Sequence, residues 1–148
     1  MTPTIDLVVN DERVLEFCSE NDVPVPRIKV VPDAVLSQSK RAIFGRCYEA
    51  GIILLYGGSF QVLYDGLVDH PVFAAPGVLA SAVTDKASAI LLHELFHWKQ
   101  FCEGKHLVMA EVEIEREARS LAQPNESTWS DLLRVVEMPA PEADETPR

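Results

Sequence analysis

Two histidines four residues apart, His93 and His97, have the spacing in this chain that best supports chemistry. They lie in the apolar segment of residues 88–98, whose pattern predicts a helix. Residues four apart on a helix lie on one face, so both imidazoles can bind the same metal ion. Glu94 projects beside that face, where its carboxylate can reach a water without being a ligand. The spacing therefore predicts a metal site with Glu94 beside it.

A catalytic zinc site needs a third protein ligand and an open position. The helix expected at residues 108–122 offers glutamates on two faces, with Glu113 and Glu117 on one and Glu111 and Glu115 on the other. The apolar side of this helix is assigned to Val112, Ala118, Leu121 and Ala122. Because Glu117 is next to that side, it can point inward more easily than Glu111 or Glu115. Glu111 and Glu115 are expected to face solvent.

The residues 93–97 resemble the H-E-x-x-H motif of zinc metallopeptidases, the zincins. Glu117-Ala118, 20 residues after His97, resembles the glutamate motif of the gluzincins, and residues 115–122 are similar to the corresponding pattern of small ImmA/IrrE-type proteins. The resemblance implies one zinc ion held by His93, His97 and Glu117. It also implies a minimal α+β zincin fold, in which a small antiparallel sheet packs on the active-site helix and a glutamate-bearing helix lies behind it.

Two alternatives for the third ligand stay open. One is Glu113, which shares a face with Glu117. The other is His106, a loop residue here, because a later histidine serves as the third zinc ligand in SprT-like proteases. Leu121 stands where thermolysin-type gluzincins often carry an aspartate that orients a histidine ligand. Gln100 and Glu103 stand where the metzincin pattern requires glycine and histidine, which excludes that group.

The resemblance further implies hydrolysis of peptide bonds in a protein or peptide substrate. Zinc would acidify the attacking water and polarise the scissile carbonyl, and Glu94 would accept the proton. An edge strand would hold the substrate by strand addition, and residues 52–56 or 60–64 are the candidates. The oxyanion donor is left open among five residues. These are Tyr48, Tyr56, Tyr64, His70 and His106.

Composition narrows the class of protein. The chain has 148 residues and a net charge of −10, which disfavours nucleic acid and anionic membranes as partners. No apolar run approaches the length of a membrane helix, and no secretory signal is evident at the N-terminus. Three widely spaced cysteines, Cys18, Cys47 and Cys102, disfavour a disulfide framework. We therefore expect a cytoplasmic protein.

The expected organisation is one domain over residues 1–137, followed by a disordered acidic tail at residues 138–148. Residues 1–9 are expected to be loose or extended. Helices are expected at 11–20, from Thr84 or Asp85 to 103, at 108–122 and at 127–136. Strands are expected at 27–31, 42–48, 51–56 and 60–64, with 52–56 central in its sheet.

Two other classes of function remain compatible with the sequence. One is a regulatory or partner-binding domain in which zinc is mainly structural. The other is a metal-free accessory protein in which both histidines are buried in the core.

Overall fold

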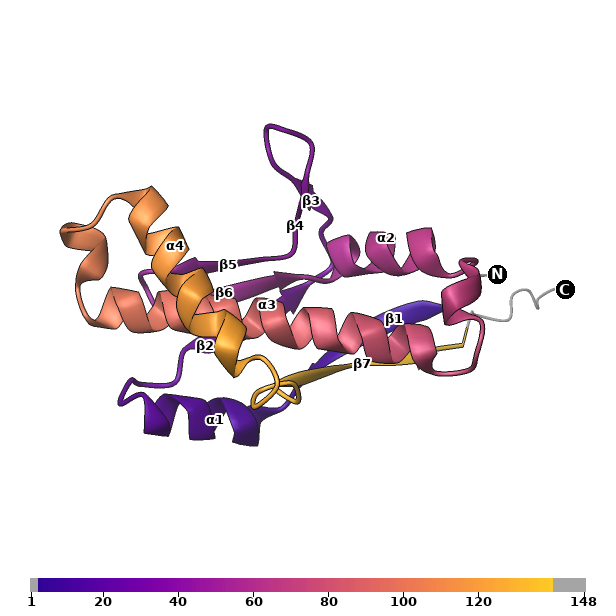
Figure 1. The fold of residues 1–148 in the computed structure, drawn as a ribbon, viewed down its shortest axis with the longest axis horizontal. Coiled ribbons are helices and arrows are strands. Elements are labelled where there is room, and N and C mark those ends of the chain that lie inside the picture. The colour runs from indigo at the N-terminus through magenta and orange to yellow at the C-terminus, as the bar shows by residue number, and fades with distance from the viewer. Residues whose placement is uncertain (1–2, 140–148) are drawn as a thin grey trace, which may run out of the picture.

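The computed structural model describes residues 3–139, which form an α+β fold (Figure 1). The helices are α1 (Asp11–Glu20), α2 (Gly57–Leu67), α3 (Val78–Cys102) and α4 (Glu111–Ala122), with short 3₁₀ turns η1 (Pro71–Phe73), η2 (Lys105–Leu107) and η3 (Gln123–Asn125). The strands are β1 (Thr4–Val9), β2 (Arg27–Val31), β3 (Val35–Leu36), β4 (Ala42–Ile43), β5 (Gly45–Tyr48), β6 (Ile52–Tyr56) and β7 (Leu133–Met138). None of the helices in this part of the chain combines the length and the apolar character needed to cross a membrane.

The strands form three small sheets. β6 lies between β2 and β5, which confirms the prediction that the apolar run at residues 52–56 is a central strand. β5 pairs with β6 in an antiparallel hairpin, whereas β2 runs parallel to β6. This sheet is therefore mixed, and the expectation of a purely antiparallel sheet is wrong. β1 and β7 form an antiparallel pair, and β3 and β4 form a short hairpin that projects from the body (Figure 1).

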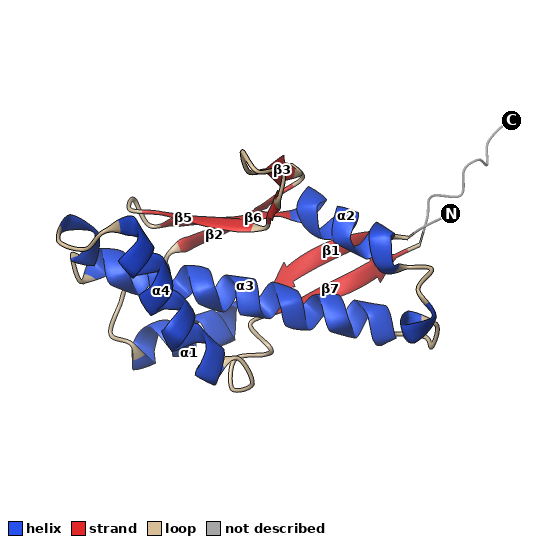
Figure 2. Cartoon of the chain, turned by 45° about the horizontal axis from the view of Figure 1, so that its top comes forward, coloured by secondary structure: helices blue, strands red, loops and turns tan. Residues whose placement is uncertain are grey.

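The long helix α3 runs beneath the three-stranded sheet and continues past the β1–β7 pair (Figure 2). Its buried side carries Leu91, Leu92 and Leu95, each at most 1% exposed. Burying an aliphatic side chain of this size contributes about 1.5–3 kcal/mol. Gly104, at φ +73°, ends the helix in the left-handed conformation that favours glycine. The core around α3 thus fixes the position of the segment that carries both histidines.

Helix α1 forms where the sequence predicts it, with the Asn10 side chain accepting a hydrogen bond from the Arg13 backbone amide. The strand expected at residues 27–31 is also confirmed as β2. Residues 4–9, expected to be loose or extended, form β1 in register with β7. Helix α3 begins at Val78, six or seven residues before the expected start at Thr84 or Asp85, and α4 begins at Glu111 rather than residue 108.

The strand expected at residues 60–64 is wrong, because these residues lie inside helix α2. Phe60 and Tyr64 are buried and Val62 is 60% exposed, a pattern that satisfies both a two-residue alternation and a four-residue helical spacing. Gly57 and Gly58, the first two residues of α2, allow the helix to form here. A Cβ atom at Gly58 would lie 2.4 Å from the carbonyl oxygen of Pro32, so the chain can begin a helix against the end of β2 only with glycine there.

The helix expected at residues 127–136 is also wrong. Residues 126–132 form turns, and β7 follows them. Leu133 and Val135 are buried while Arg134 is exposed, which is the two-residue period of a strand with one covered face. Of the tail expected at residues 138–148, Met138 ends β7, and residues 140–148 lie outside the described residues.

Ser88 connects α3 to β7 through a buried pair of hydrogen bonds. Its hydroxyl donates to the Leu133 carbonyl at 2.9 Å and accepts from the Leu133 amide at 3.2 Å. Because Ser88→Ala leaves both backbone groups without a partner, we expect the free energy of unfolding to fall by about 1–3 kcal/mol. Ser81→Ala, at an exposed site on the same helix, is the control. Urea unfolding measures both, and equal stabilities would contradict this role.

Candidate metal centre

Two helices bring three possible metal ligands together. His93 and His97 lie on one face of α3, and Glu115 reaches them from α4. The orientation of α4 follows from Ala118 and Ala122, which are buried in the core. Glu115 lies three residues before Ala118 and seven before Ala122, so it shares their face of the helix. The packing of α4 therefore directs the Glu115 carboxylate at the histidine pair.

The three ligand atoms converge on one point. The Oε1 atom of Glu115 lies 2.6 Å from Nε2 of His93 and 3.0 Å from Nε2 of His97. The two Nε2 atoms lie 3.1 Å apart. All three groups are partly buried. Burial lowers the pKa of His93, against the raising effect of its hydrogen bond to Glu115, and so favours the neutral ring that binds metals.

Gln100 fixes the orientation of the His97 ring. Its amide nitrogen donates to the Ile114 carbonyl at 3.0 Å and to Glu117 Oε1 at 2.9 Å, so its oxygen must be the atom 2.8 Å from His97 Nδ1. That oxygen can only accept, and His97 Nδ1 therefore carries the hydrogen. In the neutral ring, Nε2 then presents its lone pair to Glu115 and His93. Gln100 is 2% exposed, which shields this arrangement from water.

The donor set fits a bound cation. The His97 lone pair and the Glu115 carboxylate oxygen face each other at 3.0 Å, and both are acceptors when the ring is neutral. A positive charge between them relieves that repulsion. Ligands at tetrahedral zinc distances lie roughly 3.3 Å from one another, close to the separations found here. Within residues 3–139, a group of three or more His, Cys, Asp or Glu side chains that could hold one metal ion is found here.

Glu94 lies beside this cluster and is 8% exposed. Burial raises the pKa of its carboxyl to about 7, against the lowering effects of His97, a backbone hydrogen bond from Cys47, and Arg46. Cys47 belongs to β5, so the strand next to the pocket also holds the Glu94 carboxylate. The structure places Glu94 where the sequence predicts a group near, but outside, the metal ligands.

The expected third ligand, Glu117, is not in the cluster. Its carboxylate accepts hydrogen bonds from Gln100 and from Lys105, each at 2.9 Å, and these partners lower its pKa. Glu113, the first alternative, bonds to the backbone amide of Ala110 at the start of α4. His106, the second, lies 2.9 Å from Glu49. The structure instead brings Glu115 to the histidines, a residue expected to face solvent.

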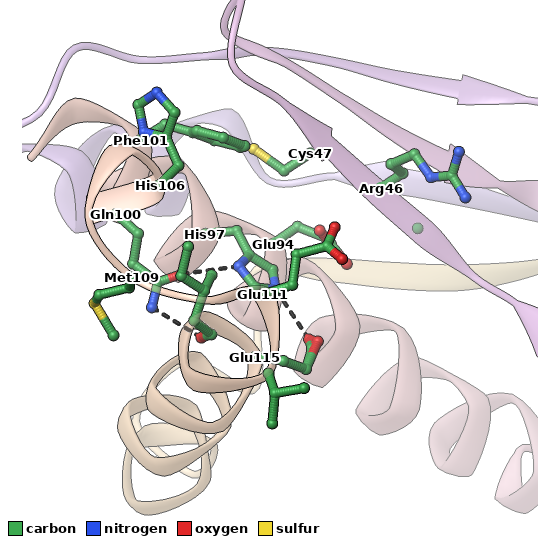
Figure 3. Close-up of a pocket in the computed structure, with 13 residues that line it drawn as sticks. Arg46, Cys47, Glu94, His97, Gln100, Phe101, His106, Met109, Glu111 and Glu115 are labelled. Atoms are coloured by element: carbon green, nitrogen blue, oxygen red, sulfur yellow. Dashed lines mark hydrogen bonds and ion pairs between the residues drawn. The ribbon is translucent and has the colours of Figure 1, made fainter. Parts of the chain in front are cut away.

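A pocket of about 650 Å³ opens beside the cluster, between β5, the end of α3 and the start of α4 (Figure 3). His97, Glu94 and Glu115 line it. Sequence reasoning did not assign several other lining residues to a site. They are Gly45, Arg46, Cys47, Gln100, Phe101, Met109, Glu111, Val112 and Ile114. The three- and seven-residue spacings to Ala118 and Ala122 were the signal that could have identified Glu115.

Of the five candidate oxyanion donors, His106 lines the pocket. Tyr64 is buried against Glu137, and His70 accepts a hydrogen bond from the Val72 amide. The two candidate edge strands are wrong. Residues 60–64 are helical and residues 52–56 are the central strand, so β5 is the sheet edge beside the pocket.

In comparisons with known proteins, no family model, curated protein or solved structure matches the chain. The interpretation of the site therefore depends on its geometry and donor chemistry.

Three glutamates of α4 provide a direct test of the third ligand. We expect Glu115→Gln to weaken zinc binding at least about 100-fold, because it removes an anionic ligand from the cluster. Glu113→Gln should bind zinc like the unaltered chain. Glu117→Gln should weaken binding only about tenfold, since it acts through Gln100. Competition with a chromophoric chelator measures all three. A larger loss with Glu117→Gln than with Glu115→Gln would contradict the assignment.

Proposed function

We propose that this chain is a zinc-dependent metallopeptidase in which His93, His97 and Glu115 hold the metal ion and Glu94 is the general base. The observation that carries the proposal is the convergence of two imidazole nitrogens and one carboxylate oxygen beside a buried glutamate. Two histidines and one glutamate are the ligand set of catalytic zinc in the thermolysin type of peptidase. The adjoining pocket leaves room for a substrate.

A zinc ion held there would supply Lewis acidity, which acidifies water and polarises a carbonyl group. The residues of the chain provide the remaining functions. Gln100 keeps the Nδ1 proton on His97 and so leaves Nε2 free to bind metal. Glu117, held by Lys105, positions Gln100 in turn. Gln100 and Glu117 thus orient a histidine, the role that an aspartate often has in thermolysin-type gluzincins at the position of Leu121.

Glu94 accepts the proton of the attacking water and transfers it to the leaving amine. Its pKa of about 7 suits both steps at neutral pH, since the group can be ionised before the attack and protonated after it. The backbone hydrogen bond from Cys47 and the burial of the side chain keep the carboxylate in one position. Glu94 is thus fixed relative to both the metal ligands and β5.

The free edge of β5 is the proposed binding site for the substrate backbone. The backbone amide of Tyr56 donates a hydrogen bond to the Phe44 carbonyl, so the backbone groups on this side of β5 pair with β6. By the alternation of an antiparallel ladder, Gly45 and Cys47 direct their backbone groups to the other side. The Cys47 amide bonds to Glu94, so Gly45 is the residue free to pair with an extended peptide. Strand addition would then place a scissile bond in the pocket.

The proposed class is a minimal zincin of the gluzincin type, with Glu115 rather than Glu117 as its glutamate ligand. The α3 motif, the glutamate on the next helix and the β5 edge beside the pocket all support this class. The parallel pairing of β2 with β6 does not alter the site, because β2 lies on the far side of β6 from the pocket.

The test is hydrolysis of a quenched fluorescent peptide library by the zinc-loaded chain. We expect Glu94→Gln to retain one zinc ion per chain and to lose about 100- to 10,000-fold in rate, the usual contribution of a general base. Glu113→Gln, on the exposed side of α4, is the control. Metal analysis accompanies each assay. Unchanged cleavage by Glu94→Gln would contradict the proposal, and bound zinc without cleavage by the unaltered chain would favour a regulatory domain.

A further inference from the structure

The side of the three-stranded sheet that faces away from α3 carries three cations. A Cβ atom at Gly45 would lie 3.2 Å from Ile90 of α3, so Gly45 faces the helix. Arg46, the next residue of β5, borders the pocket at the strand edge but alternates to the opposite side of the sheet. Ile53 and Leu55 of β6 are fully buried, so the alternating residues Ile52 and Leu54 lie on that same outer side.

The strand register arranges the outer side in rows. Arg27, Ile52 and Tyr48 form one row across the three strands, and Lys29, Leu54 and Arg46 form the next. We call these six residues the outer face. Two half-buried aliphatic side chains form its centre, while the three cations and Tyr48 are exposed at the two edges. Cations thus flank an apolar strip on both sides.

The outer face differs in charge from the rest of the chain, which carries a net charge of −10. It contains three positive charges and no carboxylate. Within residues 3–139, neither Arg27, Lys29 nor Arg46 takes part in an ion pair. Burial and Tyr48 raise the pKa of Tyr56, Arg46 lowers it, and the nearby carboxylate of Asp33, which lies past the end of β2, adds a smaller raising effect. Helices α1, α3 and α4 lie on the other side of the sheet (Figure 2).

We propose that the outer face binds an acidic, extended peptide segment of a protein partner. Carboxylates spaced along such a segment can reach the cations on both edges, and its apolar side chains can cover Ile52 and Leu54. Complementary charge supplies specificity and the apolar strip supplies buried area. This inference goes beyond the proposed hydrolysis and does not depend on a bound metal.

A short peptide fits this surface better than nucleic acid does. Three cations match a few carboxylates, whereas a nucleic acid presents a phosphate at every nucleotide and extends past the patch. Beyond the patch it meets a chain of strongly negative net charge. Arg46 also lies on β5, the strand whose free edge adjoins the pocket. An acidic partner on the outer face is therefore held next to the candidate metal centre.

The experiment uses the full chain with Glu94→Gln, so that the probe is not cleaved. The probe is a fluorescein-labelled peptide of twelve alternating glutamate and leucine or alanine residues, and fluorescence anisotropy measures its binding. We expect the triple variant Arg27→Glu, Lys29→Glu, Arg46→Glu to weaken binding at least about tenfold. The matched control is Lys40→Glu, Arg116→Glu, Arg134→Glu, which changes the net charge equally and should weaken binding less than about twofold.

Circular dichroism establishes that each variant is folded, and the three single substitutions to glutamine replace the triple variant if it is not. Equal binding by the outer-face and control variants would overturn the proposal. So would tighter binding of an oligothymidylate or of phosphatidylserine vesicles than of the peptide. Glu142→Gln, Asp144→Asn, Glu145→Gln tests the acidic C-terminal segment of the chain itself. Binding about tenfold tighter in that variant would assign the face to this segment and overturn the choice of an external partner.

Discussion

Burial of helix α3 is the constraint on which the other parts of the structure depend. The helix packs against β5 and β6 on one side and against β7 farther along, and α4 crosses it near its C-terminal half. Leu91, Leu92 and Leu95 lose nearly all contact with water. A helix buried on several sides has little freedom to rotate, because any rotation would expose these leucines. His93 and His97 are therefore held in fixed directions before any ligand binds.

The second half of the site depends on hydrogen bonding rather than on apolar packing. Gln100 is nearly inaccessible to water, and each of its polar atoms has a partner. Because its amide nitrogen is committed to α4, its oxygen must accept from His97. One buried amide thus connects the two helices and sets the hydrogen position on His97. Glu117 contributes to this network, which explains why a glutamate next to the apolar side of α4 is not itself part of the cluster of His93, His97 and Glu115.

The sequence correctly predicts the helix that carries both histidines and the hairpin that precedes it, because each has a strong local signal. The H-E-x-x-H spacing is typical of a helix, and the continuous apolar run at residues 52–56 predicts a central strand. The choice between Glu115 and Glu117 depends on which way α4 faces. Val112 suggests one direction but is 66% exposed, and the small residues Ala118 and Ala122 set another. The apolar residues of segments 60–64 and 127–136 fit both a helical and a two-residue strand period, and tertiary contacts decide which of the two structures forms.

We propose that His93, His97 and Glu115 hold one zinc ion. Anomalous diffraction at the zinc absorption edge, measured on crystals of the zinc-loaded chain, locates the ion and its ligands directly. We expect one anomalous peak per chain, bonded to Nε2 of both histidines and to the Glu115 carboxylate, with Glu117 still bonded to Gln100. A peak bonded to Glu117 in place of Glu115, or the absence of a peak between the two histidines, would contradict it.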